Sequence, residues 1–478
     1  MMEPADPKDD LLNEENADLK KRKFIIYSLI ILGIVALIII IIIVIVALNK
    51  EDQGQQSQES GFLNKIKANY IVKDSGSKIK LINKPIDNLN IHLFINDKET
   101  NFDYECQFNE TGEYSVEFSF NEELTNLSSL FMDVINLKKI DLTGITIDKV
   151  KNMDNLFKGC ISLESANLNK INTLNLESMK SMFQGCTNLI KLDMENFITS
   201  STKDTTSMFE NCYNISEINI NYFNFTNIED ANYMFRNCYS LTEISLVNDI
   251  KSSDINMKSA FSECHSLKKL NLEKFGKKNI KELSFMFNNC YSLESIDLSK
   301  FDISQVTSID NLFSNCSSLQ SIDISNLNFN NVEYMGYAFK YCSKLTSIDL
   351  SNFNTSKAKT ISGLFFGCSS LENISMNKFN INITSIADLF NGCSSLKNVA
   401  LKVDNVKQVD RVFKNCTSLK VLDLSEFNGL GIALYINDFF PIIEKASIIY
   451  NSSIFGKSLE NKIPEGWNKT DLNNQTIY

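Results

Sequence analysis

Histidine, tryptophan and proline are scarce in this chain, with two, one and five residues among 478. The two histidines, His92 and His265, leave little for metal or triad chemistry, which needs imidazole groups together with further ligands or with an acid and a nucleophile. The motifs G-x-S-x-G and H-E-x-x-H, the P-loop and the glycine-rich nucleotide fingerprint are all missing. We therefore expect no enzymatic activity, no catalytic residue, no metal site and no cofactor.

Positive charge is also in deficit, with 47 lysines and arginines against 58 aspartates and glutamates, a net charge of −11 and a pI near 5. Nucleic-acid binding needs clustered basic residues that neutralise phosphates, so this balance argues against a nucleic-acid partner. Asn, Ser, Ile and Leu dominate instead, which suits a protein with a polar surface and an aliphatic interior.

One apolar run determines the expected compartment. The stretch 24–48, FIIYSLIILGIVALIIIIIIVIVAL, is uncharged throughout and long enough to span a bilayer with some tilt. Four basic residues precede the run: Lys20, Lys21, Arg22 and Lys23. The positive-inside rule then predicts a single-pass protein of the cell membrane, with a cytosolic N-terminus and everything after residue 48 outside. A cleaved signal peptide is the alternative, but its apolar part usually has only ~7–15 residues, and no small-x-small cleavage site follows here.

An internal repeat organises the rest of the chain. Its clearest sign is a series of cysteines at a constant interval as far as Cys368, with slightly shorter intervals after it: 160, 186, 212, 238, 264, 290, 316, 342, 368, 393 and 416. An earlier, atypical unit has Val134 in place of the cysteine. Positions in each unit are numbered from its cysteine, or from Val134 in the first unit, so Phe313 is at −3 in the unit of Cys316.

Each unit divides into two halves. Before the cysteine, apolar residues fall at −10, −7, −4 and −3, and steps of three and four predict a helix with one buried face. After it they fall at +3, +6 and +8, which predicts a short strand. One helix and one strand cannot bury their own apolar faces, but stacked copies can. The sequence therefore predicts an α/β solenoid, a right-handed stack of about twelve helix–strand units with one parallel sheet.

The unit also carries a resemblance. The pattern M-F-x-N-C-x-S-L-x-x-I-D-L-S-x-F, as in residues 285–301, resembles the BspA-type leucine-rich repeat of surface proteins from bacteria, mycoplasmas and single-celled eukaryotes. The resemblance covers almost every unit and implies a cell-surface protein used in adhesion or recognition. It supplies no site residues. The chain departs from the bacterial lipoproteins of this class, because it has no lipid-attachment cysteine near the N-terminus.

The expected organisation has six parts: a cytosolic disordered tail 1–23, a transmembrane signal anchor 24–48, a polar spacer 49–60, a β-rich N-terminal cap 61–124, the repeat solenoid 125–428 and a C-terminal cap 429–478. Alternating apolar residues in NIHLFIND and EYSVEFSF predict the strands of the first cap. A strand near 448–450 and the IPEGW turn are expected to close the other end. One turn, 246–261, breaks the pattern with Asp249 and Asp254, and predicts either a bend or bulge or a loop with specific contacts.

The cysteine row has three possible roles. A single cysteine in each repeat lacks the paired spacing of zinc sites. Disulfides between neighbouring turns need Cα atoms within ~7 Å, whereas packed helices lie ~8–10 Å apart. Packing as small buried residues is the favoured interpretation, supported by Val134. The phenylalanine at −3 is likewise expected to be core: Phe157, Phe183, Phe209, Phe235, Phe261, Phe287, Phe313, Phe339, Phe365, Phe390 and Phe413.

Partners of leucine-rich solenoids usually meet the exposed side of the strands, here positions +5, +7 and +9. The +7 column reads Asn167, Asp193, Asn219, Ser245, Asn271, Asp297, Asp323, Asp349, Ser375, Ala400 and Asp423. Its candidate partner-binding residues are Asp193, Asn219, Asn271, Asp297, Asp323, Asp349 and Asp423. Calcium or a basic partner could use such carboxylates, but aspartates at a fixed repeat position also serve as solvated or turn-bonding residues, and calcium loops of the D-x-D kind are missing.

Twelve N-x-S/T sequons follow the apolar run. Candidate glycan acceptors are Asn109, Asn126, Asn214, Asn354, Asn382 and Asn451, and Asn315 and Asn415 precede core cysteines. Together these features predict a surface protein whose extracellular solenoid binds a protein or glycan ligand. The alternative is a structural or antigenic coat component without a defined ligand. The ligand and the oligomeric state stay open.

Overall fold

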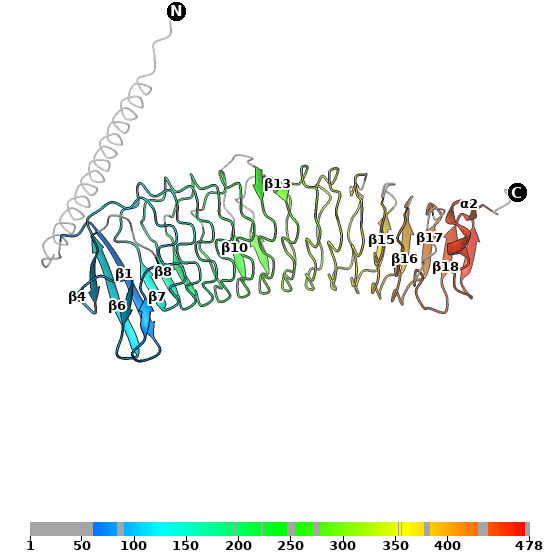
Figure 1. Ribbon diagram of the computed structural model, residues 1–478. Helices are drawn as coiled ribbons and strands as arrows, with labels where there is room; N and C mark the ends of the chain where they lie inside the picture. The colour runs from blue at the N-terminus through cyan, green and yellow to red at the C-terminus, as the bar shows by residue number, and fades with distance from the viewer. Residues whose placement is uncertain are drawn as a thin grey trace, which may run out of the picture. The chain divides into compact units, whose positions relative to one another are not determined.

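The computed structural model (Figure 1) describes residues 61–83, 90–195, 197–220, 223–245, 254–271, 278–351, 353–354, 356–376, 383–404, 406–428 and 438–473. All of them except Gly61 belong to one compact unit, Phe62–Tyr478. The basic cluster at 20–23, the apolar run 24–48 and the sequon at Asn382 lie outside the described residues. In the described ranges, no helix is long and apolar enough to cross a membrane.

A small antiparallel sheet precedes the repeats. Its region contains β1 (Asn64–Val72), β2 (Lys78–Lys80), β3 (His92–Ile95), β4 (Lys98–Thr100), β5 (Glu105–Gln107) and β6 (Gly112–Phe120). Strand β1 alternates buried and outward residues, pairs with β6 on one side and on the other pairs with β7 (Leu137–Asp141), the strand of the first repeat. The cap therefore shares one sheet with the first turns, in the order β4-β3-β6-β1-β7-β8-β9, and covers the edge that the first turn would otherwise expose.

The predicted parallel strands after the cysteine are confirmed. They are β8 (Ser165–Asn167), β9 (Lys191–Asp193), β10 (Glu243–Ser245), β12 (Lys269–Asn271), β15 (Asn373–Met376), β16 (Asn398–Leu401) and β17 (Val421–Leu424). Equivalent positions pair in register, as Ser165 does with Lys191, and single bridges such as Asp297–Asp323 join turns without a full strand. Because so few residues per turn are extended, the parallel pairing falls into several short sheets rather than the single sheet expected.

A second parallel row runs along position −8, on the other side of each turn. It consists of isolated bridges, for example Asn152–Ser178 and Ser308–Tyr334, together with β11 (Asp254–Asn256) and β13 (Lys278–Glu282). The short strand β14 (Phe301–Asp302) pairs with the start of β13. The pairing of β11 with β13 shifts register between Ile255 and Asn256. The irregular turn predicted from Asp254 thus contains a bulge, which buries Ile255 and leaves Asp254 paired with Lys281 at 2.8 Å.

The predicted helices are wrong. Residues −7 to −1 form consecutive tight turns, because two residues per repeat have positive φ, such as Asn155 at 57° and Gly159 at 74°. Within the segment, hydrogen bonds join residues three apart, as from the Cys160 N–H to the Phe157 carbonyl at 3.1 Å. Alternate N–H groups donate instead to the next turn, as from Phe157 to the Met182 carbonyl at 2.8 Å. The backbone is therefore hydrogen-bonded between turns on this side too, which a helix could not do.

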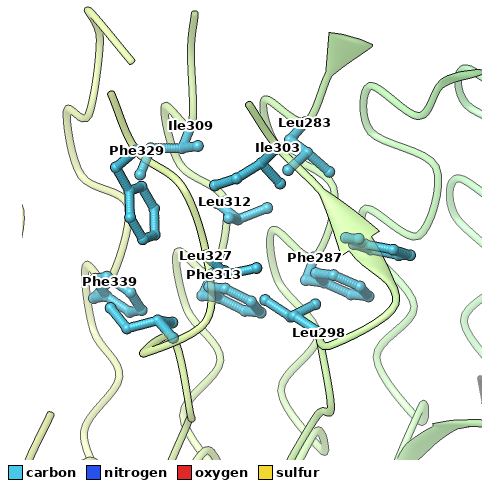
Figure 2. Close-up of a pocket in the computed structure, with 12 residues that line it drawn as sticks. Leu283, Phe287, Leu298, Ile303, Ile309, Leu312, Phe313, Leu327, Phe329 and Phe339 are labelled. Carbon is cyan, nitrogen blue, oxygen red and sulfur yellow. The ribbon is translucent and has the colours of Figure 1, made fainter. Parts of the chain in front are cut away.

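The phenylalanines at −3 form the centre of the core, as predicted. With Phe131 they are twelve rings, and each stacks on the next with centroids 5.3–5.9 Å apart. Phe118 of the cap meets the first ring edge-on. One small void of about 10 Å³ lies beside Phe287 and Phe313, lined only by apolar side chains (Figure 2). It offers water no hydrogen-bond partner, so it is expected to be dry.

The stack closes with residues near the end of the described chain. Strand β18 (Ser447–Tyr450) extends the parallel sheet as expected, and β19 (Asn468–Asp471), not foreseen, adds to it. Two short helices, α2 (Ser452–Phe455) and α3 (Lys457–Glu460), lie between them. Phe439 meets the last core ring edge-on at 5.4 Å, so both ends of the described ring stack are covered by an aromatic edge.

Candidate functional site

The cysteine row belongs to the core, which confirms the packing interpretation. Eleven cysteines, from Cys160 to Cys416, are buried and unpaired, and Cys106 in the cap is half-buried and also unpaired. Each buried thiol donates to the carbonyl oxygen of the −3 phenylalanine one turn earlier, with S–O distances of 3.0–3.2 Å. Burial raises the pKa of every one of them, to about 12 for Cys416. Such thiols are poor nucleophiles and poor metal ligands.

The predicted binding column at +7 lies on the strand side. Asp193, Asn271 and Asp423 are half-buried at the ends of β9, β12 and β17. Asn219, Asp297, Asp323 and Asp349 are exposed, and the structure brings Asp297 beside Asp323 on neighbouring turns.

These aspartates also have a structural role. The carboxylates of Asp297, Asp323, Asp349 and Asp423 each accept a hydrogen bond of 2.8–3.0 Å from the N–H two residues on. Hydrogen bonds from Ser325 lower the pKa of Asp323. This is the turn-bonding role that the sequence left open. A binding role for the column stays a prediction.

No part of the described chain brings together three or more His, Cys, Asp or Glu residues in a way that could hold a metal ion.

The sequons differ in accessibility. Asn109, Asn126 and Asn214 are exposed, whereas Asn354 and Asn451 are half-buried. The Asn354 amide donates to Asn330 of the preceding turn at 2.6 Å, and Asn451 caps α2 by accepting from Ser453. At −1, asparagines link neighbouring turns, as Asn315 does to Asn289 at 2.5 Å. Glycosylation of any of them stays a prediction.

The sequence interpretation missed a row of surface rings at position +1, directly after the cysteine. Tyr213, Tyr239, His265 and Tyr291 follow one another in four turns, with centroids 4.8, 4.6 and 4.8 Å apart. We call these four residues the exposed ladder. Tyr291 is 41% exposed and the other three are half-buried. The words CYN, CYS, CHS and CYS at fixed spacing were a readable signal, but the expected binding face was the strand side.

A second group of surface rings lies in later turns, in columns before the cysteine. Lys340 sits over the rings of Tyr337, Tyr341 and Phe366, with its Nζ 5.2–5.6 Å from each centroid. Tyr341 in turn covers Gly367, where a Cβ would lie 2.3 Å from the tyrosine ring. These rings are therefore already in contact with Lys340, and Tyr341 also packs on Gly367 of the next turn.

The fold and these columns define a leucine-rich-repeat-like solenoid of about eleven cysteine-marked turns. Residues 125–247 and 255–379 match the family described as mycoplasma protein of unknown function, DUF285, which is just over half of the chain, and the chain belongs to this family. Residues 333–432 match the BspA type leucine-rich repeat region in six copies, so the resemblance stated from the sequence is confirmed.

Solved leucine-rich-repeat structures are similar at low identity. The pneumococcal vaccine antigen PcpA is 16% identical, with 70% of this chain and 71% of that chain covered and a TM-score of 0.26. A Leptospira interrogans LRR protein is 11% identical, with 68% of this chain and 81% of that chain covered and a TM-score of 0.23. The Drosophila Toll–Spatzle complex is 16% identical, with 69% of this chain and 49% of that chain covered and a TM-score of 0.24. The chain thus spans less than two thirds of the Toll structure, and the same holds for the plant receptor RGFR1 at 64%. Among proteins of curated function, none matches the chain.

Proposed function

We propose that this chain is a single-pass cell-surface protein whose solenoid lies outside the cell and binds macromolecular partners. The observation that carries the proposal is the solenoid itself. Stacked turns repeat the same outward positions at +1, +5 and +7, so rows of side chains that the core does not require are presented to solvent on a rigid backbone. No catalytic role is assigned to the chain, because it carries no recognisable catalytic motif.

The compartment in this proposal rests on the sequence. The apolar run 24–48, with its basic cluster before it and acidic residues after it, supports an anchor that leaves the repeats outside. The BspA-type repeats support the same placement, since this repeat class is one of surface proteins.

Antibody labelling of intact cells that express the full chain tests the compartment. An antibody against the C-terminal residues should label cells without permeabilisation, whereas a tag placed before residue 20 should be labelled only after it. The reverse pattern would place the solenoid in the cytosol and would replace surface recognition with an intracellular scaffold.

Adhesion of the same cells tests the binding role. Expressing cells should bind to partner cells or matrix in a saturable way that soluble competitor chain reduces. Surface labelling without saturable binding would favour the coat-component alternative instead.

A further inference from the structure

The exposed ladder is not needed to build its part of the fold. In six other turns position +1 is Ser or Thr, whereas the first two turns have Ile135 and Ile161 there. Each of these six hydroxyls donates to the +1 carbonyl of the preceding turn, as Ser343 does to Ser317 at 3.3 Å. The backbone bond that joins these turns uses the N–H at +2 instead, as from Ser292 to the His265 carbonyl at 3.2 Å. Four consecutive rings at a position where serine suffices therefore require an explanation beyond folding.

A carboxylate lies among these rings. Glu263 Oε2 is 2.9 Å from His265 Nε2, and the Asn289 amide donates to the other carboxylate oxygen. Burial raises the pKa of the Tyr239 and Tyr291 phenols, and the charge of Glu263 raises both further. At Tyr239 the neighbouring Tyr213 also raises the pKa, and the charge of Arg236 lowers it. Over the described residues, the only basic side chain that pairs with Glu263 within 4 Å is His265.

Several other surface rings of this solenoid are matched by cations from the chain itself. Lys340 lies over the Tyr337 group, and Lys359 Nζ is 5.1 Å from the Tyr334 ring centroid. Arg236 lies 5.5 Å from the Tyr233 centroid and pairs with Glu210, so it is already engaged. No lysine or arginine of the described ranges is found over a ring of the exposed ladder. The uncovered face of Tyr291, which carries negative electrostatic potential, therefore lacks the cation that Tyr233, Tyr334 and Tyr337 have.

The end of the ladder is open. Beyond Tyr291 the next +1 residue is Ser317, whose side chain is too small to cover a tyrosine ring, and Tyr291 is 41% exposed. Inside the ladder the rings cover one another's faces. A guanidinium needs an open aromatic face and a nearby carboxylate, and this end of the ladder offers both.

We propose that Tyr291, at the open end of the exposed ladder, and the neighbouring Glu263 bind an arginine-bearing segment of a partner protein, with the guanidinium against Tyr291 and its charge balanced by Glu263. This rests on the proposed function, for which it specifies the partner. The surrounding asparagines and serines match the composition of protein-binding surfaces, in which rigid tyrosines supply contact area at low entropic cost. The net charge of −11 favours encounter with a basic partner.

The test is peptide binding by the purified full chain in a mild non-ionic detergent. Hexa-arginine and hexa-lysine peptides are titrated at ~0.15 M salt, where screening limits non-specific attraction. The key variant is the double substitution Tyr239→Ser/Tyr291→Ser, which removes the tyrosines on both sides of His265 and leaves the net charge unchanged. Serine is the natural residue at +1 in four later turns, from Ser317 to Ser394. Tyr104→Ser, which removes a 38% exposed ring in the cap, is the matched control. Circular dichroism and protection of the buried thiols verify folding of each variant.

Wild type and the Tyr104→Ser chain should bind hexa-arginine alike, and more tightly than hexa-lysine. The double variant should bind hexa-arginine about tenfold more weakly and lose the preference for arginine. Glu263→Gln should weaken both peptides. Equal binding of hexa-arginine to wild type and double variant would overturn the proposal, and so would ladder-dependent binding of the neutral glycan chitohexaose, which would assign the surface to sugars. Since purified chain is used, this result is independent of the cell-labelling and adhesion assays.

Discussion

Two stacks of rings run through neighbouring turns of this solenoid, one inside and one on the surface. The buried stack at −3 has twelve phenylalanines with centroids 5.3–5.9 Å apart, and it passes through every turn. The exposed ladder at +1 has four rings 4.6–4.8 Å apart, and serine or threonine replaces it in most other turns. Ring stacking between neighbouring turns therefore occurs both where packing requires a phenylalanine and where a small polar residue would also fit.

The difference teaches how to interpret a repeated residue. A buried ring is covered by its two neighbours, so a smaller residue at one turn leaves a cavity that affects three turns. At the surface position +1, serine or threonine can replace the ring, because its hydroxyl donates a hydrogen bond to the backbone of the preceding turn. Uniform columns such as −3 and the cysteine thus report on packing, whereas a departure confined to a few turns of a variable column points to a role outside folding.

The largest expected difference between the buried columns and the surface ladder is a loss of folding stability at alkaline pH, which the buried thiols should cause. Burial holds the pKa of the eleven thiols well above the usual value of about 8.5, and the unfolded chain loses this shift. A folded-state pKa that is raised gives stability that is complete below the unfolded value and is lost as the pH rises toward the folded value. Each thiol should therefore cost about 1.4 kcal/mol of unfolding free energy per pH unit above ~9, and eleven should act together.

Guanidinium unfolding at pH 7, 9 and 10 measures this effect. The midpoint should be nearly constant up to pH 8 and should fall steeply by pH 10. A chain with Cys290→Val should show a slope smaller by about one thiol's share. An unchanged midpoint between pH 7 and 10 would contradict the buried, protonated thiol row.

The next largest effect is expected from Phe287→Ala. The substitution removes a ring stacked between Phe261 and Phe313 and enlarges the void beside it, so the free energy of unfolding should fall by about 3–5 kcal/mol. Tyr291→Ser, four residues away in the exposed ladder, should cost less than about 1 kcal/mol, because the surface position has a polar substitute. Comparable losses in the two variants would remove the distinction between the stacks, and a loss under about 1 kcal/mol for Phe287→Ala would contradict the register.

The sequence predicted the inward columns and the strand half well, because burial alternates with period two around +6 and recurs at the same positions of every repeat. It failed for the other half. Spacings of three and four fit a helix, but they also fit successive tight turns with the same inward positions. The discriminating signal was the enrichment of Asn, Gly and Ser at −5 and −1, for example Asn155 and Gly159, since Asn and Gly adopt positive φ most readily.

The candidate site was harder to predict than the fold. The +7 aspartates were found because they recur, and their recurrence turned out to include an Asx-type turn bond in at least four turns. The exposed ladder was missed because its contacts run between residues one repeat apart, and only the stacked turns show that Tyr239 and His265 meet. The anchor at 24–48 and the sequon at Asn382 lie outside the described residues and stay predictions.

The smallest expected effect concerns the thiol itself. Cys290→Val keeps the packing but removes the S–H bond to the Phe261 carbonyl, 3.1 Å long, while the N–H of Cys264 still donates to that oxygen. The loss should be about 1 kcal/mol at neutral pH, measured by denaturant unfolding.

The natural exception supports this assignment. Val134 stands in the first turn, which follows the cap, so no −3 carbonyl of an earlier turn is available to a thiol there. The reverse substitution Val134→Cys should therefore give no gain in stability, although Cys290→Val gives a loss. If the two substitutions produced equal and opposite changes, side-chain volume alone would explain the cysteine row. Unequal changes would show that each turn needs its cysteine as a donor to the turn before it.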